Sequence, residues 1–491
     1  MYAGQRLLAA ERLYLDVWDH KGPLVHHVNA LAAVSADHRL GVWWLRLGWL
    51  VLTAVLAATL LTRRYSPPAT VAGAAVAFAP LALLAEGGNM VEEYALLTSW
   101  ASLACVAAPA RQGGGVRSLA VGVLSGASFA LRPNLVATPA AVFGVLLMQG
   151  RGRIERLIPF SCGMALIGGA LALALGGLEG VQACWDAVWV YNRAYVAAGK
   201  PLAMDTWWDL EGPARWFFGV VLAAWVASAL PLSRAPRTED PLRLAALLAF
   251  PVEVVAVSLS GRAYLHYLLA LTPVAGVLFA ASVADFMRQD RSASPQGTWG
   301  TGLGVALALF TAAAMTRAPF ALLAHSFRGH KVAERASSLA RAAELTQLGT
   351  EGGRLWVWGA ESSALVLSRR VSPVRYYYAY PLLTRGYASP TRVEEVKGGL
   401  CRRRPEILEA SFNNPNIPPV RREARDAWRA SHPSYFVSDS VDELLQFVAT
   451  YWREGDRLPH TGFVRWYPPP ADSLDFTLEC AKLPQGVNPK K

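Results

Sequence analysis

Ten apolar segments, each close to the length of a membrane-spanning helix, constrain this chain more than any other feature. A helix needs about 20 apolar residues to cross the hydrocarbon core of a bilayer. The chain has 53% hydrophobic and only 17% charged residues, whereas soluble domains have roughly 25% charged residues. It is therefore predicted to be mainly α, a polytopic bundle of membrane helices. The segments run over residues 41–62, 69–86, 94–110, 116–131, 134–149, 157–175, 213–233, 242–260, 264–285 and 300–323.

Arginine residues in the short connections predict the orientation of these spans. They occupy every second connection, and Lys and Arg are enriched in cytoplasmic loops. The opening segment, the 176–212 loop and all residues after about 325 are then predicted to lie outside. A free N-terminus is rarely exported without a preceding helix. We therefore expect that Met1 is not the true start and that one helix is missing before it. The arginine-bearing connections hold Arg63 with Arg64, Arg111 with Arg117, Arg151 with Arg153 and Arg156, Arg234 with Arg237, and Arg288 with Arg291.

The composition changes near residue 325, which divides the chain into a predicted membrane domain, 1–325, and a small extracytoplasmic α/β domain, 326–491. Cys401 and Cys480 share this polar region and would form a disulfide if it is exported. We expect an amphipathic helix over 330–348, strands over 354–359, 364–368, 374–380 and 405–408, and a helix over 441–453.

The net charge of +11 is interpreted as topology and as attraction to anionic lipid or phosphate. Nucleic-acid binding is not expected, because the arginines cluster between apolar runs and no aromatic RNA-binding motif is present. The five cysteines show no metal-type spacing. The C-terminal region has no Gly-rich phosphate loop and no nucleophile or zinc motif. Catalytic chemistry is therefore expected in the membrane domain.

Several acidic and basic residues share the predicted outer side. Cations there can hold phosphate oxygens while a carboxylate deprotonates an acceptor hydroxyl, which suits a lipid-linked phosphate as donor. A charged flank of a membrane helix is the alternative interpretation of the first loop. The candidates are Asp16, Asp19, His20 and Lys21 in the first loop, then Glu86, Asn89, Glu92, Glu93, Arg132, Arg262 and His266.

Two features lie within the spans themselves. Arg46 and Glu253 are each costly alone in hydrocarbon, so they are expected to pair with one another or to point into a polar cavity. The short spans 116–131 and 134–149 are separated by Arg132-Pro133-Asn134. Such a break either lines a cavity or forms a tight hairpin whose arginine snorkels to lipid phosphate.

Several short motifs follow one another in a fixed order along the chain. They are Tyr14–Leu24, Asn89–Ala95, Arg132–Asn134, Gly261–Tyr267 and Trp356–Gly359. Together they resemble the motifs of the C-type (GT-C fold) membrane glycosyltransferases, a family that includes the bacterial protein O-mannosyltransferase-like and aminoarabinose-transferase-like enzymes. The resemblance covers most of the chain, and the joint order of the motifs is more specific than any one of them.

The resemblance implies an inverting glycosyltransferase of the plasma membrane. Such an enzyme moves a sugar from a polyprenyl-phosphate donor to a cell-envelope acceptor, a glycan, lipid or protein, on the outer face. Lys21 would contact the donor phosphate, Arg262 and His266 would also face the donor, and Glu92 or Glu93 matches the acidic position of the second external loop. His20 and Arg132 are also predicted to bind the donor phosphate, because they share the predicted outer side of the membrane.

One departure from the family concerns the general base. The Asp-Glu pair that family members usually carry would fall just upstream of Met1. Either the start is misassigned, or this polypeptide is inactive, or Asp16 and Asp19 have taken over the role. If they share one helical turn, these two could also hold a divalent cation against the donor phosphate; otherwise Asp19 pairs with Lys21 or Arg12 and fixes the loop. A transporter or flippase and a non-catalytic membrane scaffold are the rival functions.

Overall fold

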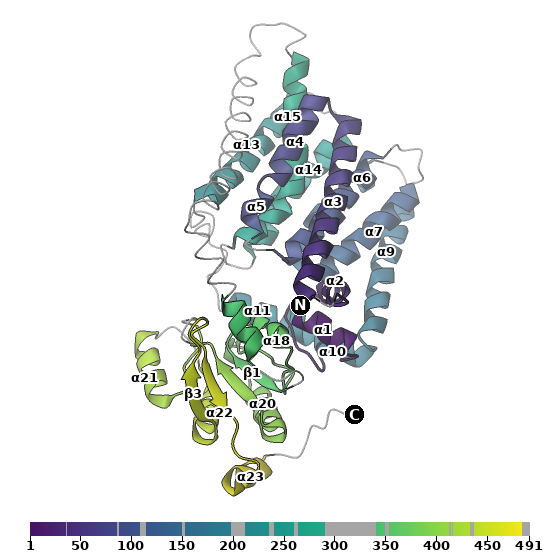
Figure 1. Cartoon of the computed structure of the whole chain (residues 1–491). Coiled ribbons are helices and arrows are strands. Elements are labelled where there is room, and N and C mark those ends of the chain that lie inside the picture. The colour runs from purple at the N-terminus through teal and green to yellow at the C-terminus, as the bar shows by residue number, and fades with distance from the viewer. Residues whose placement is uncertain are drawn as a thin grey trace. The chain divides into compact units, whose positions relative to one another are not determined.

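The computed structural model describes residues 1–35, 37–85, 88–108, 114–149, 153–197, 212–234, 240–259, 264–289, 340–348, 353–411, 414, 416–432 and 437–483. It is mainly helical and divides into two compact units (Figure 1). Unit 1 comprises Met1–His20, Leu175–Ala198 and Arg328–Lys491. Unit 2 comprises Lys21–Ala174 and Gly199–Phe327.

Unit 2 is a bundle of apolar helices. Within the described residues, five helices are long and apolar enough to cross a membrane: Leu40–Arg64, Gly114–Leu131, Arg153–Ala174, Pro241–Ser258 and Leu265–Asp285. Nine of the ten predicted spans coincide with helices, and the tenth, 300–323, lies outside the described residues. The elements are α2 (Pro23–Ala33), α3 (His38–Arg64), α4 (Pro67–Phe78), α5 (Leu81–Leu84), α6 (Val91–Ala107), α7 (Gly114–Leu131), η1 (Pro133–Val136), α8 (Ala137–Met148), α9 (Arg153–Ala174), α13 (Gly212–Arg234), α14 (Pro241–Ser258), η3 (Leu265–Leu271) and α15 (Thr272–Gln289).

The outer helices of this bundle expose apolar side chains. Leu52 and Val55 of α3 are 54% and 58% exposed, and Leu166 of α9 is 63% exposed. A soluble protein rarely leaves so continuous an apolar surface open. Inside the bundle α4 packs closely on α15, because a Cβ at Gly73 would come within 2.5 Å of the Gly276 carbonyl oxygen. Small residues at helix contacts and apolar residues outside are typical of a multi-pass membrane protein.

Unit 1 is an α/β fold with a mixed four-stranded sheet of order β1-β2-β4-β3. Strand β1 pairs parallel with β2, and β4 runs antiparallel to both β2 and β3. The strands are β1 (Leu355–Trp358), β2 (Glu406–Glu409), β3 (Arg453–Arg457) and β4 (Val464–Tyr467). The helices are α1 (Tyr2–Leu8), α10 (Leu178–Cys184), the π-helix η2 (Trp185–Val190), α11 (Tyr191–Ala197), α18 (Ser363–Leu367), α19 (Tyr380–Leu383), α20 (Pro390–Arg403), α21 (Arg422–Ser431), α22 (Asp439–Tyr451) and α23 (Leu474–Ala481).

Three separate parts of the chain build the core of unit 1. Trp18 from the first loop and Tyr191 from α11 pack with the buried strand residues Trp356 and Trp358 in one hydrophobic cluster. Residues 1–20 and 175–198, which sequence analysis assigns to the membrane domain, therefore fold with the C-terminal residues. Their aromatic side chains find apolar partners there.

The secondary structure of unit 1 agrees with the prediction in part. The strands near 354 and 405 and the helix near 441 are confirmed. The expected strand over 364–368 is wrong, because Ser363–Leu367 forms α18. The expected strand over 374–380 is also wrong. The backbone of this segment forms hydrogen bonds to residues outside the sheet; for example, the Trp18 N–H donates to the Arg375 carbonyl at 3.1 Å.

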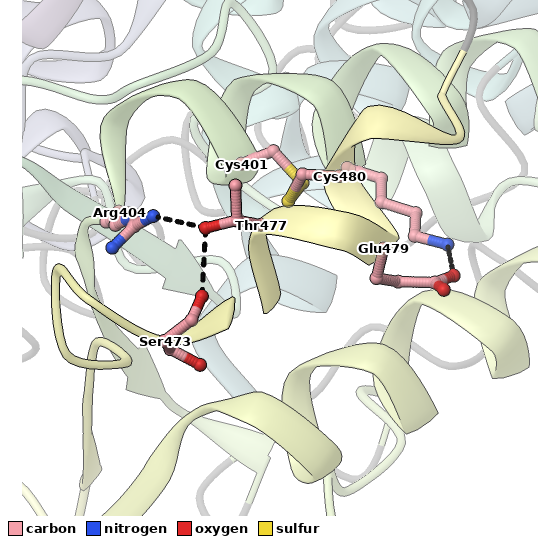
Figure 2. Close-up of a disulfide and its surroundings, with 7 residues drawn as sticks. Cys401, Arg404, Ser473, Thr477, Glu479 and Cys480 are labelled. Atoms are coloured by element: carbon pink, nitrogen blue, oxygen red, sulfur yellow. Dashed lines mark hydrogen bonds and ion pairs between the residues drawn. A yellow bond between two sulfur atoms is a disulfide. The ribbon is translucent and has the colours of Figure 1, made fainter. Parts of the chain in front are cut away.

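A disulfide joins Cys401 of α20 to Cys480 of α23, as predicted (Figure 2). Their Cα atoms are 5.7 Å apart, and 79 positions separate them in the sequence. Beside the bridge Arg404 donates to Thr477, whose hydroxyl in turn donates to the Ser473 carbonyl at 2.8 Å. The bridge fastens the last described helix to the rest of unit 1.

Candidate functional site

Two consecutive glutamates at the start of α6 form the centre of a buried charged cluster in unit 2. Glu92 and Glu93 lie in the first turn, where the helix dipole favours negative charge, and are only 2% and 3% exposed. Arg46 of α3 donates to Glu93 from Nε at 2.8 Å and from Nη2 at 3.2 Å. This bidentate pair satisfies an arginine that lies within an apolar helix.

Glu92 holds a second arginine at the same end of the bundle. Arg132, between α7 and η1, donates from Nη1 to Glu92 at 2.7 Å and from Nη2 to the Tyr267 hydroxyl at 2.8 Å. Its guanidinium also lies over the Tyr267 ring, 4.4 Å from the centroid. Only two of its five N–H groups are used in these bonds. Arg132 is thus fixed in orientation while its side chain stays 28% exposed.

The turn that carries Lys21 packs against the end of α7, directly before Arg132. A Cβ on Gly22 would lie 2.2 Å from the Ala130 carbonyl oxygen and 2.6 Å from that of Leu131, so only glycine fits there. Pro23 then begins α2. Lys21, which is exposed, therefore belongs to the same end of unit 2 as Arg132.

The break after α7 is fixed from a neighbouring helix. Asn134 donates to the Ala256 carbonyl of α14 at 3.2 Å. Glu253, one turn earlier on α14, accepts from the Thr138 backbone N–H at 2.9 Å and from its hydroxyl at 2.7 Å. Of the two alternatives predicted for Arg46 and Glu253, mutual pairing is wrong, since Arg46 pairs with Glu93 and Glu253 accepts from Thr138.

Asp19 and His20 lie in unit 1. Asp19 is 7% exposed and accepts from the Tyr377 hydroxyl at 2.6 Å. His20 Nδ1 lies 3.6 Å from the other Asp19 oxygen and 2.8 Å from the Tyr378 hydroxyl. Burial raises the pKa of Tyr377 well above its ordinary value, and the Asp19 carboxylate adds to this, so the hydroxyl remains a donor. The loop therefore presents a carboxylate held by a tyrosine beside a histidine.

Asp16 has a different environment, because residues 14–16 form a turn rather than a helix. Tyr14 has a left-handed backbone with φ of 68°. Asp16 accepts from the Arg12 backbone N–H at 2.8 Å and from its guanidinium at 3.2 Å. The condition for a shared helical face of Asp16 and Asp19 is not met, and Arg12 pairs with Asp16 rather than Asp19.

Of the other predicted site residues, the structure describes His266 but not Arg262 or Glu86. His266 lies in η3 with its ring stacked on Tyr264, at 5.4 Å between centroids. Arg46, Tyr267 and Tyr377 are not among the site residues predicted from the sequence. Arg46 stood out only as a charge in an apolar span, and Tyr267 only as part of a motif.

The cluster in unit 2 can hold an anionic group at one end of an apolar bundle. The carboxylates of Glu92 and Glu93 are occupied by arginines, so their observed role is to position those cations. Buried ion pairs of this kind stabilise little by themselves but fix geometry. No group of three or more metal-type ligands occurs among the residues that the structure describes. A requirement for a divalent cation stays a prediction.

Comparison with models of known protein families gives no match, and no curated protein is significantly similar to the chain.

Proposed function

We propose that this chain is an integral membrane glycosyltransferase. It moves a sugar from a polyprenyl-phosphate donor to a cell-envelope acceptor on the outer face of the membrane, with inversion at the anomeric carbon. The observation that carries the proposal is Arg132, which Glu92 and Tyr267 fix beside the Lys21 turn at one end of an apolar helical bundle. A donor with a long apolar tail and a phosphate headgroup matches such a surface.

In the proposed reaction the acceptor hydroxyl attacks the anomeric carbon while the bond from that carbon to the phosphate oxygen breaks. Polyprenyl phosphate leaves and gains negative charge on its oxygens. Lys21 and Arg132 would stabilise that charge, and His266 and Arg262 would complete the phosphate-binding set. The acceptor proton would pass to a carboxylate. Of the two aspartates of the first loop, Asp16 pairs with the Arg12 guanidinium, so Asp19 is the candidate base.

Two observations support an outward location for unit 1. The Cys401–Cys480 disulfide is typical of an oxidising compartment. The alternation of arginine-bearing connections also predicts that residues after 325 lie outside. A cysteine placed at Ser389 should react with an impermeant maleimide on intact cells. Reaction only after lysis would contradict the proposed orientation.

The test of the function compares two arginines that each pair with one carboxylate. Arg132 and Arg243 both pair with carboxylates, Glu92 and Asp285, but at opposite ends of the bundle. The full chain in nanodiscs is incubated with radiolabelled undecaprenyl-phosphate hexoses and pentoses and with cell-envelope extract. Arg132→Gln should abolish transfer and weaken undecaprenyl-phosphate binding, while Arg243→Gln should retain both.

The same experiment separates the rival functions. A transporter or flippase would move the lipid across vesicle membranes without releasing undecaprenyl phosphate. A scaffold would neither bind the lipid in an Arg132-dependent way nor transfer sugar. Either pattern would replace the transferase proposal.

A further inference from the structure

Arginines in the described part of unit 2 have two kinds of partner. Arg46, Arg132 and Arg243 each donate to a carboxylate. Arg64, Arg117 and Arg156 form no ion pair with a carboxylate within the described part of the chain, and the hydrogen bonds of Arg64 and Arg117 run to backbone carbonyls. Arg64, Arg117 and Arg156 therefore carry positive charge that no described carboxylate neutralises.

Arg64, Arg117 and Arg156 lie at the end of α3, in the first turn of α7 and at the start of α9, respectively. Arg64, the last residue of α3, donates to the Ala107 carbonyl at the end of α6. Arg117, in the first turns of α7, donates to the adjacent Ala108 carbonyl at 3.1 Å. These two guanidinium groups therefore donate to consecutive carbonyls at the end of α6.

Arg156 joins them from the start of α9. It interacts electrostatically with Arg117, and the interaction is repulsive. Its Nε lies 3.2 Å from the position that a Cβ on Gly114 would take, so the guanidinium packs on the glycine that opens α7. A side chain at position 114 would have to displace it.

Two of the guanidinium groups retain unsatisfied donors. Arg117 is 6% exposed. Among the residues that the structure describes, its buried Nε has no hydrogen-bond partner, and the buried Nη1 of Arg156 has none either. A guanidinium does not lose its proton in proteins, so the repulsion cannot be relieved by deprotonation. An anion between them would satisfy the donors and offset the repulsion.

We propose that Arg64, Arg117 and Arg156 form a phosphate-binding site at the end of unit 2 opposite the Arg132 cluster. A phosphate group offers several charged acceptor oxygens, which match the fork of N–H donors on each arginine. This site is independent of the proposed transferase site. The phosphate has two possible sources, the headgroup of an anionic phospholipid or soluble phosphate. A lipid headgroup fits the prediction that these arginine-bearing connections are cytoplasmic, where the leaflet is anionic.

The lipid source is tested by native mass spectrometry of the full chain titrated with phosphatidylglycerol. Arg117→Gln and Arg156→Gln should each weaken binding of this lipid about tenfold or more, since a hydrogen bond to a charged group contributes that much. Arg63→Gln is the matched control. It removes the same charge from an exposed neighbour at the end of α3 and should leave binding unchanged. Arg156→Lys should bind with intermediate affinity.

The phosphate source is tested with inorganic phosphate and the full chain in phosphatidylcholine nanodiscs. If phosphate raises the melting temperature of the wild type but not of Arg156→Gln, while lipid binding is the same in both, the site exists and takes soluble phosphate. Arg117→Gln removes a buried side chain and can impair folding, so the half-buried Arg156 decides the outcome. Unchanged binding of both ligands in a folded Arg156→Gln variant overturns the proposal.

Discussion

Glu253 provides the sharpest test of how the break after α7 is held in place. Its side chain is 1% exposed, and its Oε1 accepts both hydrogen bonds from Thr138. Within the described part of the chain its Oε2 is buried without a hydrogen-bond partner, and so is Oδ1 of Asn134 in η1, which contacts α14 one turn away. Two acceptors for which these residues offer no donor therefore lie where η1 and α8 pack on α14.

Substitution by alanine should destabilise the protein, whereas substitution by glutamine should not. Glu253→Ala leaves the Thr138 N–H and hydroxyl without their acceptor, and each unsatisfied buried group costs about 1–3 kcal/mol. Because the hydroxyl can rotate to another carbonyl, we expect a total loss of about 2–4 kcal/mol. Glu253→Gln keeps an oxygen for Thr138 and replaces the unpartnered Oε2 with an NH₂ donor. It should match or exceed the wild type.

The assay is reversible unfolding of the full chain in mixed micelles with rising SDS, followed by tryptophan fluorescence. The expected order of stability is glutamine variant, wild type, then alanine variant. Thr138→Val is a control that removes only the hydroxyl bond and should lose about 1 kcal/mol. If Glu253→Gln is as unstable as Glu253→Ala, the ionised carboxylate has an essential partner and this reasoning is wrong.

Three further predictions concern unit 1. Cys401→Ser should lower its unfolding free energy by about 4 kcal/mol, the loop entropy of a 79-residue separation, and dithiothreitol should destabilise the wild type but not the variant in calorimetry. In transfer assays, Asp19→Asn should lose activity and Tyr377→Phe should change its pH profile, while Asp16→Asn should remain active; equal losses for both aspartates would contradict their different environments. Burial opposes ionisation of Glu344, but bonds from the His460 and Thr461 backbone N–H groups outweigh it and hold the pKa of its carboxyl below the ordinary value. The stabilisation is then complete above the unfolded-state pKa and is lost as pH falls through the folded-state pKa, a dependence that Glu344→Gln should remove from acid-unfolding curves.

The helices of unit 2 could be predicted because apolar length is a local property of the sequence. The partners of the charges within them could not. Hydropathy shows that Arg46 requires a partner but not which helix supplies it. Consecutive helical residues point about 100° apart, so Glu92 and Glu93 reach different arginines from one turn. Only the packing of α3 and α7 against α6 decides that arrangement.

The conformation of the first loop does not follow from the spacing of its residues. Asp16 and Asp19 have the spacing of a helical face, but the left-handed Tyr14 and the Arg12–Asp16 pair form a turn. The composition of Tyr376–Tyr378 predicts a strand, yet these tyrosines pack on Tyr2 and Trp18, which are far away in the sequence. Such long-range aromatic contacts leave no periodic pattern in either segment.

The shared core of unit 1 adds a constraint on topology that charge patterning alone does not supply. Residues 1–20, 175–197 and 340–483 contribute to one fold, so they must lie on the same side of a membrane. The chain must then cross it an even number of times between each pair of these segments. Six predicted spans separate the first from the second. Four predicted spans separate the second segment from the third. That count is even only if it includes the span 300–323, which lies outside the described residues. Between the first two segments, the six predicted spans coincide with described helices and give the even number that the shared fold requires. Between the second and third segments, the span 300–323 stays a prediction. Since an even count holds for either orientation, the side itself rests on the arginines and the disulfide.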